Sequence, residues 1–118
     1  MKFRFQDFEI WKDSIVITKK LLALAKHLEE TKHFAFADQL RRAVLSISNN
    51  IAEGSGSDSK RDFAHFLTIS KRSTFECANI ILVLEQLEKV TSEKSEEYLT
   101  QLDLLSRKIT NFKKSLID

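Results

Sequence analysis

The sequence predicts an all-α protein, and more closely an antiparallel up-down four-helix bundle. The chain of 118 residues has no proline and two glycines, Gly54 and Gly56, so its composition favours long helices with few breaks. Apolar residues recur at spacings of three and four along four long segments, and no run has the period of a strand. The length suits a single domain over residues 1–118, and short connections between helices favour antiparallel neighbours.

The four predicted helices span about residues 7–28, 37–52, 59–87 and 92–116. The first has two apolar rows, a face wider than packing inside one bundle needs, so we expect part of it to cover a neighbouring subunit. Residues 29–33 are predicted as a connection, with Phe34 and Phe36 closing the bundle end beside it. Ser59 and Asp62 fit a capping box at the start of the third helix. The fourth has apolar residues in steps of four and three, a coiled-coil-like seam.

The segment from Gln39 to Gly54 carries an apolar stripe and, at the same spacing, a polar seam rich in serine and asparagine. These residues are mediocre helix formers, so the seam indicates specific polar contacts. The centre of the third helix's core stripe is small, which allows another helix to approach closely. We therefore predict a buried structural polar network between the second and third helices. Its members are Arg42, Ser46, Asn50, Glu53, Ser73 and Glu76. Arg42 is expected to pair with Glu76, because a buried charge needs a partner.

The sequence predicts no catalytic residues, no metal site and no cofactor. The three histidines are far apart. Glu30 and His33 are the one pair at metal-ligand spacing, and the sequence has no second Glu-x-x-His pair of the kind that a bundle metal site uses. An acid–base role for Glu53 and Glu76 would require both to meet in a deep cavity. Cys77 lies in an apolar stripe and is predicted to be an inert core residue.

The predicted location is the cytoplasm, without a membrane partner. A single cysteine cannot form an internal disulfide, which agrees with a reducing compartment. No apolar run approaches the roughly 20 residues of a membrane span, and the first residues lack the apolar core of a signal peptide.

The formal charge of +2 is small but unevenly distributed. From Arg41 to Arg72 there are six basic residues against three acidic ones, and from Glu85 to Asp103 six acidic residues against two basic ones. This asymmetry suits head-to-tail association as well as it suits RNA.

Two basic pairs on the third helix are 11 residues, or about three turns, apart and therefore share a face. From this pattern we predict an electrostatic nucleic-acid surface composed of Arg41, Lys60, Arg61, Lys71 and Arg72. The simpler interpretation is a solvated helix surface, because the aromatic residues suited to stacking on bases are expected mostly in the core.

The Gly54–Lys60 segment lies at the start of the third predicted helix. Because a helix N-terminus is positive, one interpretation of this segment is an anion-binding site. Its spacing does not match a Walker motif. A flexible turn followed by an N-cap is the alternative.

Several motifs resemble the signature of the four-helix-bundle proteins encoded within intervening sequences of bacterial 23S rRNA genes. They are Arg41-Arg42-Ala43, Ser46-Ile47, Asn50-Ile51-Ala52-Glu53-Gly54, Phe8 with Trp11, Phe63 with Phe66-Leu67, and Ser73 with Glu76. Ser48 stands where that family often has proline, and Arg72 where it often has glycine. The resemblance covers nearly the whole chain. It implies a small helical protein that assembles into rings, commonly pentamers. A related branch serves as the accessory protein of diversity-generating retroelements and contacts nucleic acid and a reverse transcriptase.

These observations together predict a non-enzymatic, homo-oligomeric adaptor, expected to be a pentamer. Its basic surface would associate with RNA, a ribonucleoprotein or a nucleic-acid-handling protein. The alternative is a purely protein–protein scaffold module with no nucleic-acid contact.

Overall fold

Four long helices account for most of the chain, and the computed structural model describes residues 1–117. They are α1 (Glu9–Glu30), α2 (Phe34–Ser55), α3 (Lys60–Gln86) and α4 (Ser92–Ile117), preceded by a short 3₁₀ turn, η1 (Arg4–Asp7). No strand occurs within residues 1–117, so the predicted all-α four-helix bundle is confirmed. The 3₁₀ turn was not expected from the sequence.

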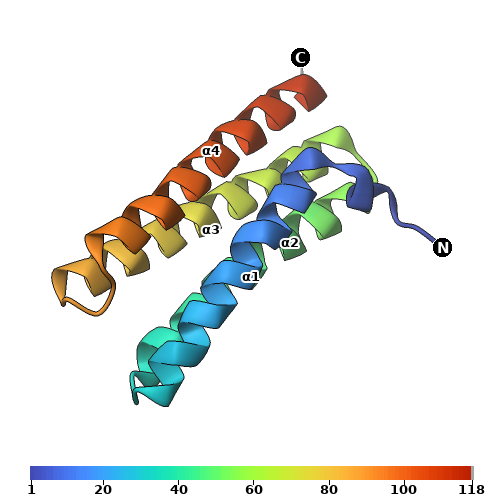
Figure 1. Cartoon of the computed structure of the whole chain (residues 1–118). Helices are drawn as coiled ribbons and strands as arrows, with labels where there is room; N and C mark the ends of the chain where they lie inside the picture. Colours follow the sequence, from blue (N-terminus) through green and yellow to red (C-terminus); the bar gives the residue numbers. More distant parts are fainter. Residues whose placement is uncertain (118) are drawn as a thin grey trace.

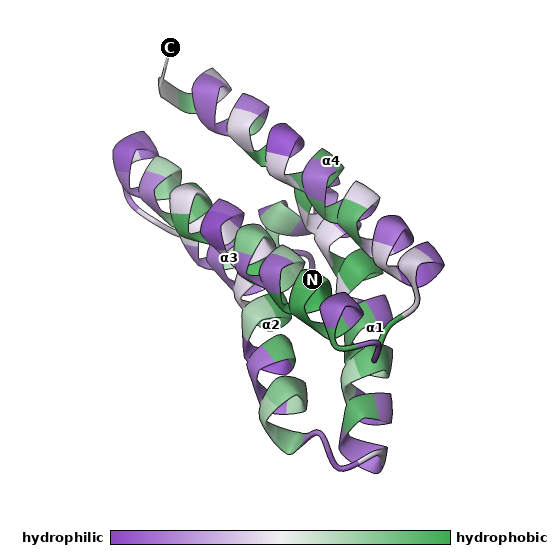
Figure 2. Cartoon of the chain, turned by 90° about the vertical axis from the view of Figure 1, so that its left-hand side faces the viewer, coloured by the Kyte–Doolittle hydropathy of each residue, from purple (hydrophilic) through white to green (hydrophobic). Residues whose placement is uncertain are grey.

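The bundle is built from two helical hairpins, α1–α2 and α3–α4, that pack mainly through α2 and α3 (Figure 1). The tips of the hairpins diverge in both views of the chain (Figures 1 and 2), and α1 contacts α4 much less than the other neighbouring helices contact each other. The start of the chain, the α2–α3 turn and the end of α4 therefore share one end of the bundle, which we call the terminal end. Along each helix, hydrophilic and hydrophobic residues alternate in short blocks, as amphipathic helices require (Figure 2).

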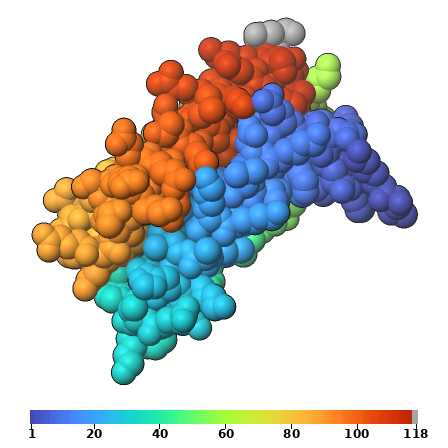
Figure 3. Space-filling view, viewed as in Figure 1, coloured from blue at the N-terminus to red at the C-terminus, as the bar shows by residue number. Residues whose placement is uncertain are grey.

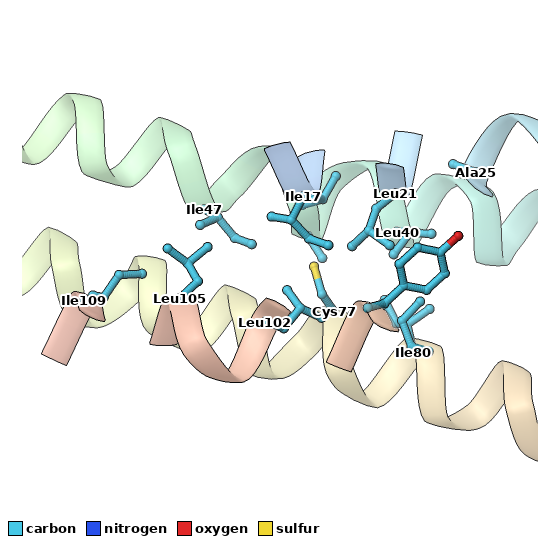
Figure 4. Close-up of a cluster of buried hydrophobic side chains, with 14 of the residues drawn as sticks. Ile17, Leu21, Ala25, Leu40, Ile47, Cys77, Ile80, Leu102, Leu105 and Ile109 are labelled. Atoms are coloured by element: carbon cyan, nitrogen blue, oxygen red, sulfur yellow. The ribbon is translucent and has the colours of Figure 1, made fainter. Parts of the chain in front are cut away.

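The core takes three fully buried large apolar side chains from every helix. They are Ile17, Leu21, Leu28, Leu40, Ile47, Ile51, Leu67, Ile81, Leu84, Leu102, Leu105 and Ile109. Each such side chain contributes roughly 1.5–3 kcal/mol when it leaves water, so this cluster dominates the stability of the fold. The sulfur of Cys77 lies inside it, near Ile17 and Leu102 (Figure 4). Burial, with the nearby Glu76 carboxylate, raises the pKa of the Cys77 thiol to about 12, and the prediction of a buried core cysteine is confirmed.

The α1–α2 tip is tighter than predicted, whereas the α3–α4 tip has the predicted bounds to within one residue. α1 and α3 are each followed by a non-glycine residue in the left-handed region, Lys32 (φ 68°) and Glu88 (φ 60°). The next backbone N–H donates back to a carbonyl in the last turn of the helix. The His33 N–H donates to the Leu28 carbonyl at 2.7 Å, and the Lys89 N–H donates to the Leu84 carbonyl at 2.8 Å. This pattern is a Schellman motif, which normally uses glycine and is hard to recognise without it.

The tight turn after α1 lets α2 begin at Phe34, three residues earlier than the sequence indicated. The prediction that Phe34 closes the bundle end is wrong, because its side chain is 58% exposed. Phe36 is half-buried and packs against the core. At the α2–α3 turn, the N-cap half of the predicted capping box is confirmed, since the Ser59 hydroxyl accepts from the Asp62 N–H at 3.0 Å.

None of the helices within residues 1–117 combines the length and the apolar character that crossing a membrane requires.

Candidate nucleic-acid interface

The polar seam of α2 meets the small residues of α3. The Ser73 hydroxyl donates to Ser46 Oγ at 2.8 Å, and Asn50 Nδ2 donates to the same oxygen at 2.9 Å. Deeper in the contact, the Ser70 hydroxyl donates to the Ile47 carbonyl at 2.8 Å. Two of these bonds tie α2 to α3, and the Ser46, Asn50 and Ser73 side chains are the part of the predicted network that the structure contains.

The charged part of that network is not buried. Arg42, Glu53 and Glu76 are exposed, and none of them forms an ion pair in the described part of the chain. The prediction of a buried Arg42–Glu76 pair is therefore wrong for the single chain. The cause is the closeness of the helices: the short serine side chains occupy the line of contact and leave the long side chains on its outer flank.

Four of the five predicted nucleic-acid-binding residues form a row along α3. This row, which we call the α3 basic row, consists of Lys60, Arg61, Lys71 and Arg72. Lys71 is half-buried and the other three are exposed. Within residues 1–117 none of the four lies within ion-pair distance of a carboxylate, so their charge is free for an external anion.

Lys113 of α4 extends this row, although the sequence prediction did not include it. Lys113 Nζ donates to Thr68 Oγ1 of α3 at 2.7 Å, which places a further cation beside the row. Arg107 of α4 lines a hollow with Lys71, but its charge is compensated there by Asp103, whose Oδ2 lies 3.1 Å from Arg107 Nε. The basic run at the end of α4 was visible in the sequence, but its position beside α3 depends on the packing of the two helices.

Arg41 does not belong to this surface. Its guanidinium pairs with Glu29 of α1 and lies 3.6 Å from Asp38 of α2. Its charge is thus compensated within the chain, and it lies toward α1 rather than α3. The inclusion of Arg41 in the predicted set is corrected accordingly.

The Gly54–Ser59 turn uses its hydroxyls internally. Ser57 Oγ donates to the Gly54 carbonyl at 2.6 Å, and Ser59 caps α3. This geometry supports the turn-and-cap interpretation of the segment. Across residues 1–117, no cluster of three histidine, cysteine or acidic side chains is suited to holding a metal ion.

Charge divides along the 43 Å length of the molecule. The segments at the terminal end (residues 1–12, 53–65 and 107–117) hold nine basic and five acidic residues. The segments at the hairpin tips (residues 26–41 and 82–97) hold five basic and eight acidic residues. The terminal end is therefore the more basic end and the hairpin tips are the more acidic one, while Arg42, Lys71 and Arg72 of the predicted basic region lie between the two ends.

The family model described as 23S rRNA-intervening sequence protein matches residues 6–111. The chain belongs to this family. A crystal structure of a protein of unknown function from the S23 ribosomal protein family, from Bacteroides thetaiotaomicron, superposes with a TM-score of 0.85 at 24% identity. The match covers 89% of this chain and 98% of that one, and it supports the fold. No curated protein matches the chain at a significant level.

Both departures from the family pattern are accommodated. Ser48 is buried within an unbroken α2, and its hydroxyl donates to the Leu45 carbonyl at 3.4 Å. Arg72 points away from the contact that Ser70 and Ser73 make with α2, so it does not obstruct the close approach of the two helices.

Proposed function

We propose that this protein is a non-enzymatic, self-associating adaptor of the cytoplasm that holds RNA, or an RNA–protein complex, on the α3 basic row. The observation that carries this proposal is the uncompensated charge of the row. Four cations follow one helix without a carboxylate partner among the described residues, and α4 adds Lys113 beside them.

Such a surface suits a phosphate backbone better than a single small anion. Lys60 and Lys71 are 11 residues apart on one helix, which corresponds to about 16 Å at ~1.5 Å per residue. A nucleic acid spans this distance with several phosphates. Each neutralised phosphate releases counterions, and this release is the main source of non-specific affinity.

Exposed apolar side chains support self-association. Phe75 is 62% and Leu82 45% exposed on one flank of α3. Phe75 and Ala78 line a groove of about 200 Å³ against Leu99 of α4. Large exposed apolar groups on a helix flank are typical of protein interfaces. The pentamer implied by the family resemblance is the assembly we propose.

The same apolar flank favours the second candidate, a scaffold module that binds only proteins. The net charge of +2 is low for a nucleic-acid-binding protein, and a protein partner would need no phosphate contacts.

A salt titration of RNA binding separates the two functions. For an RNA adaptor, the logarithm of the binding constant falls steeply with the logarithm of the salt concentration. The double variant K71E/R72E should bind RNA at least about tenfold more weakly than the wild type. The slope of its salt dependence should be flatter by roughly 1.4, since each phosphate contact contributes ~0.7 to that slope for single strands.

The control is K19E/K26E, which changes the net charge equally at exposed positions of α1. If both double variants bind alike, net charge alone governs binding and the basic row has no special role. If RNA binding is undetectable or independent of salt, the scaffold function is correct.

A further inference from the structure

The N-terminal segment carries an aromatic stack that the sequence did not predict to be accessible. The rings of Phe3 and Phe5 are nearly parallel, with centroids 5.6 Å apart and an interplanar angle of 16°. Phe5 in turn lies 5.5 Å from Trp11 of α1 in a tilted arrangement. We call these three residues the N-terminal stack. It begins in solvent at Phe3, which is 61% exposed, and ends against the helix.

The segment that holds this stack is fixed by several contacts. The Phe3 N–H donates to Gln6 Oε1 at 2.8 Å, and the Gln6 N–H donates back to the Phe3 carbonyl at 3.1 Å. The Arg4 guanidinium lies over the rings of Phe8 and Phe63, at 5.5 and 5.9 Å from their centroids. Arg4 Nη2 also donates to the Ser55 carbonyl at 3.3 Å. The stack is therefore held in place before any partner arrives.

The N-terminal segment that carries the exposed ring projects from the body of the molecule. Figure 3 shows the N-terminal segment as a protrusion at the right of the view, beyond the helices. In the described part of the chain, Phe5 is the one ring that stacks on Phe3. An aromatic ring buries a large apolar area when another ring stacks on it, so the open face of Phe3 gains free energy from a stacking partner.

The surroundings of the stack are basic. Lys2, Arg4 and Lys12 lie within or beside the segment, and the terminal end as a whole has an excess of basic residues. Lys2 pairs with Asp7 at 2.7 Å, whereas Lys12 is exposed and has no ion-pair partner among residues 1–117.

We propose that the N-terminal stack is a stacking platform for an unpaired base of single-stranded nucleic acid. This inference rests on the proposed function for its choice of nucleic acid as the partner. It adds a second binding site and a preference for single strands. A base would extend the stack on Phe3, and the adjoining phosphates would face Lys12 and Arg4. A purely apolar partner fits less well, because it would desolvate these cations without pairing them.

The test compares the variants F3A and F34A by fluorescence anisotropy, with a labelled single-stranded RNA and with the duplex of the same sequence. Phe34 is a matched control, since it is 58% exposed and lies at the opposite end of the bundle. F3A should weaken single-strand binding by on the order of tenfold and leave duplex binding unchanged. Its salt slope should equal that of the wild type, because stacking releases no counterions.

Two further measurements separate stacking from a general apolar contact. F3W should retain the affinity, while F3L, which is apolar but has no π-face, should lose it as F3A does. The single tryptophan of the chain, Trp11, lies in the stack, so its emission should change when single-stranded RNA binds to the wild type.

Equal affinities of F3A and F34A for single-stranded RNA would overturn the platform and leave the α3 basic row intact. A loss of mass in light scattering for F3A, without a change in RNA affinity, would show that another copy of the chain covers Phe3. If the wild type binds no RNA at all, the proposed function itself fails. A strong effect of F3A with no effect of K71E/R72E would support the platform and reject the basic row.

Discussion

Gly54 determines how closely α2 and α3 meet at their shared turn. A Cβ atom at this position would lie 2.8 Å from both Phe63 Cδ1 and Phe66 Cβ. The Phe66 Cβ is attached directly to the backbone, so the contact cannot be relieved by a side-chain rotation. We predict that G54A lowers the free energy of unfolding by about 1–3 kcal/mol, because this overpacking outweighs the ~1 kcal/mol that alanine gains over glycine in a helix.

Gly56 provides the matched control for urea unfolding. A Cβ there has the Glu53 carbonyl at 3.6 Å as its nearest neighbour, and its backbone is in the right-handed region. G56A should therefore be neutral or stabilising by up to ~1 kcal/mol, since alanine reduces the entropy of the unfolded chain. A G54A variant as stable as G56A would show that α2 and α3 separate at little cost.

At the residue scale, the sequence predicted contacts made by short side chains better than those made by long ones. Ser46 and Ser73 meet as expected, because their spacing and size leave few alternatives. Arg42 and Glu76 were placed together on the same pattern, yet their long side chains reach water instead. The accessibility of Phe3 could not be predicted, since an aromatic residue ahead of an amphipathic helix more often belongs to the core.

At the scale of the elements, ion pairs of Lys20 and Lys108 join α1 to α4, the pair of neighbouring helices with the least contact, and those of Lys108 are the shorter. Lys108 Nζ lies 2.8 Å from Glu9 Oε1 and 2.9 Å from Asp13 Oδ2. The hydrogen bond from Lys108 holds the pKa of the Glu9 carboxyl below its usual range. The bond to Glu9, followed by the bond to Asp13, raises the pKa of the Lys108 ammonium above its ordinary value.

These shifts predict a pH dependence that the variant K108M should lose. The stabilisation from Glu9 is present above its pKa in the unfolded chain and disappears as the pH falls through the lowered pKa of the folded state. The stabilisation from Lys108 is present below the ordinary lysine pKa and disappears as the pH rises through the raised one. The urea midpoints of wild type and K108M should therefore differ most between about pH 5 and 9, and converge toward pH 3.

K114M is the control for this series, because it removes the same charge from an exposed position near the end of α4. Its midpoint should follow that of the wild type at every pH. If the urea midpoints of wild type and K108M differ by a constant amount from pH 3 to 9, the lysine contributes to stability through the packing of its aliphatic stem and not through its charge.

The sequence predicted every helix but not every boundary. Periodicity identified the four elements and placed the α3–α4 connection to within one residue. The α2–α3 break was placed too early, because α2 continues three residues past its predicted end, through Gly54 to Ser55. The α1–α2 turn is shorter than predicted, because it depends on Lys32 in the left-handed conformation, which carries no signal in the sequence without a glycine. The 3₁₀ turn η1 was missed for a related reason, since four residues are too few to show a period.

On the scale of the whole molecule, the charged ends and the apolar flank of α3 are two alternative surfaces for association. The more basic end and the more acidic end are separated along a body 43 Å long, several times the Debye length of about 10 Å at 0.1 M salt. The exposed Phe75 and Leu82 lie on the flank of α3, beside the groove with α4. Association through the ends would weaken with salt, whereas association through the flank would not.

We expect the flank to drive assembly, because burying large apolar side chains gains more free energy than screened pairing of surface charges. Light scattering at micromolar concentration should give a mass several times the 13.7 kDa of the chain, unchanged between low and high salt. F75E should reduce that mass to the monomer, since a carboxylate cannot be buried unpaired in an apolar contact. F34E places the same charge on an equally exposed phenylalanine at a hairpin tip and should leave the mass unchanged. A mass that falls as salt rises would assign assembly to the charged ends, and a monomeric wild type would remove self-association from the proposed function.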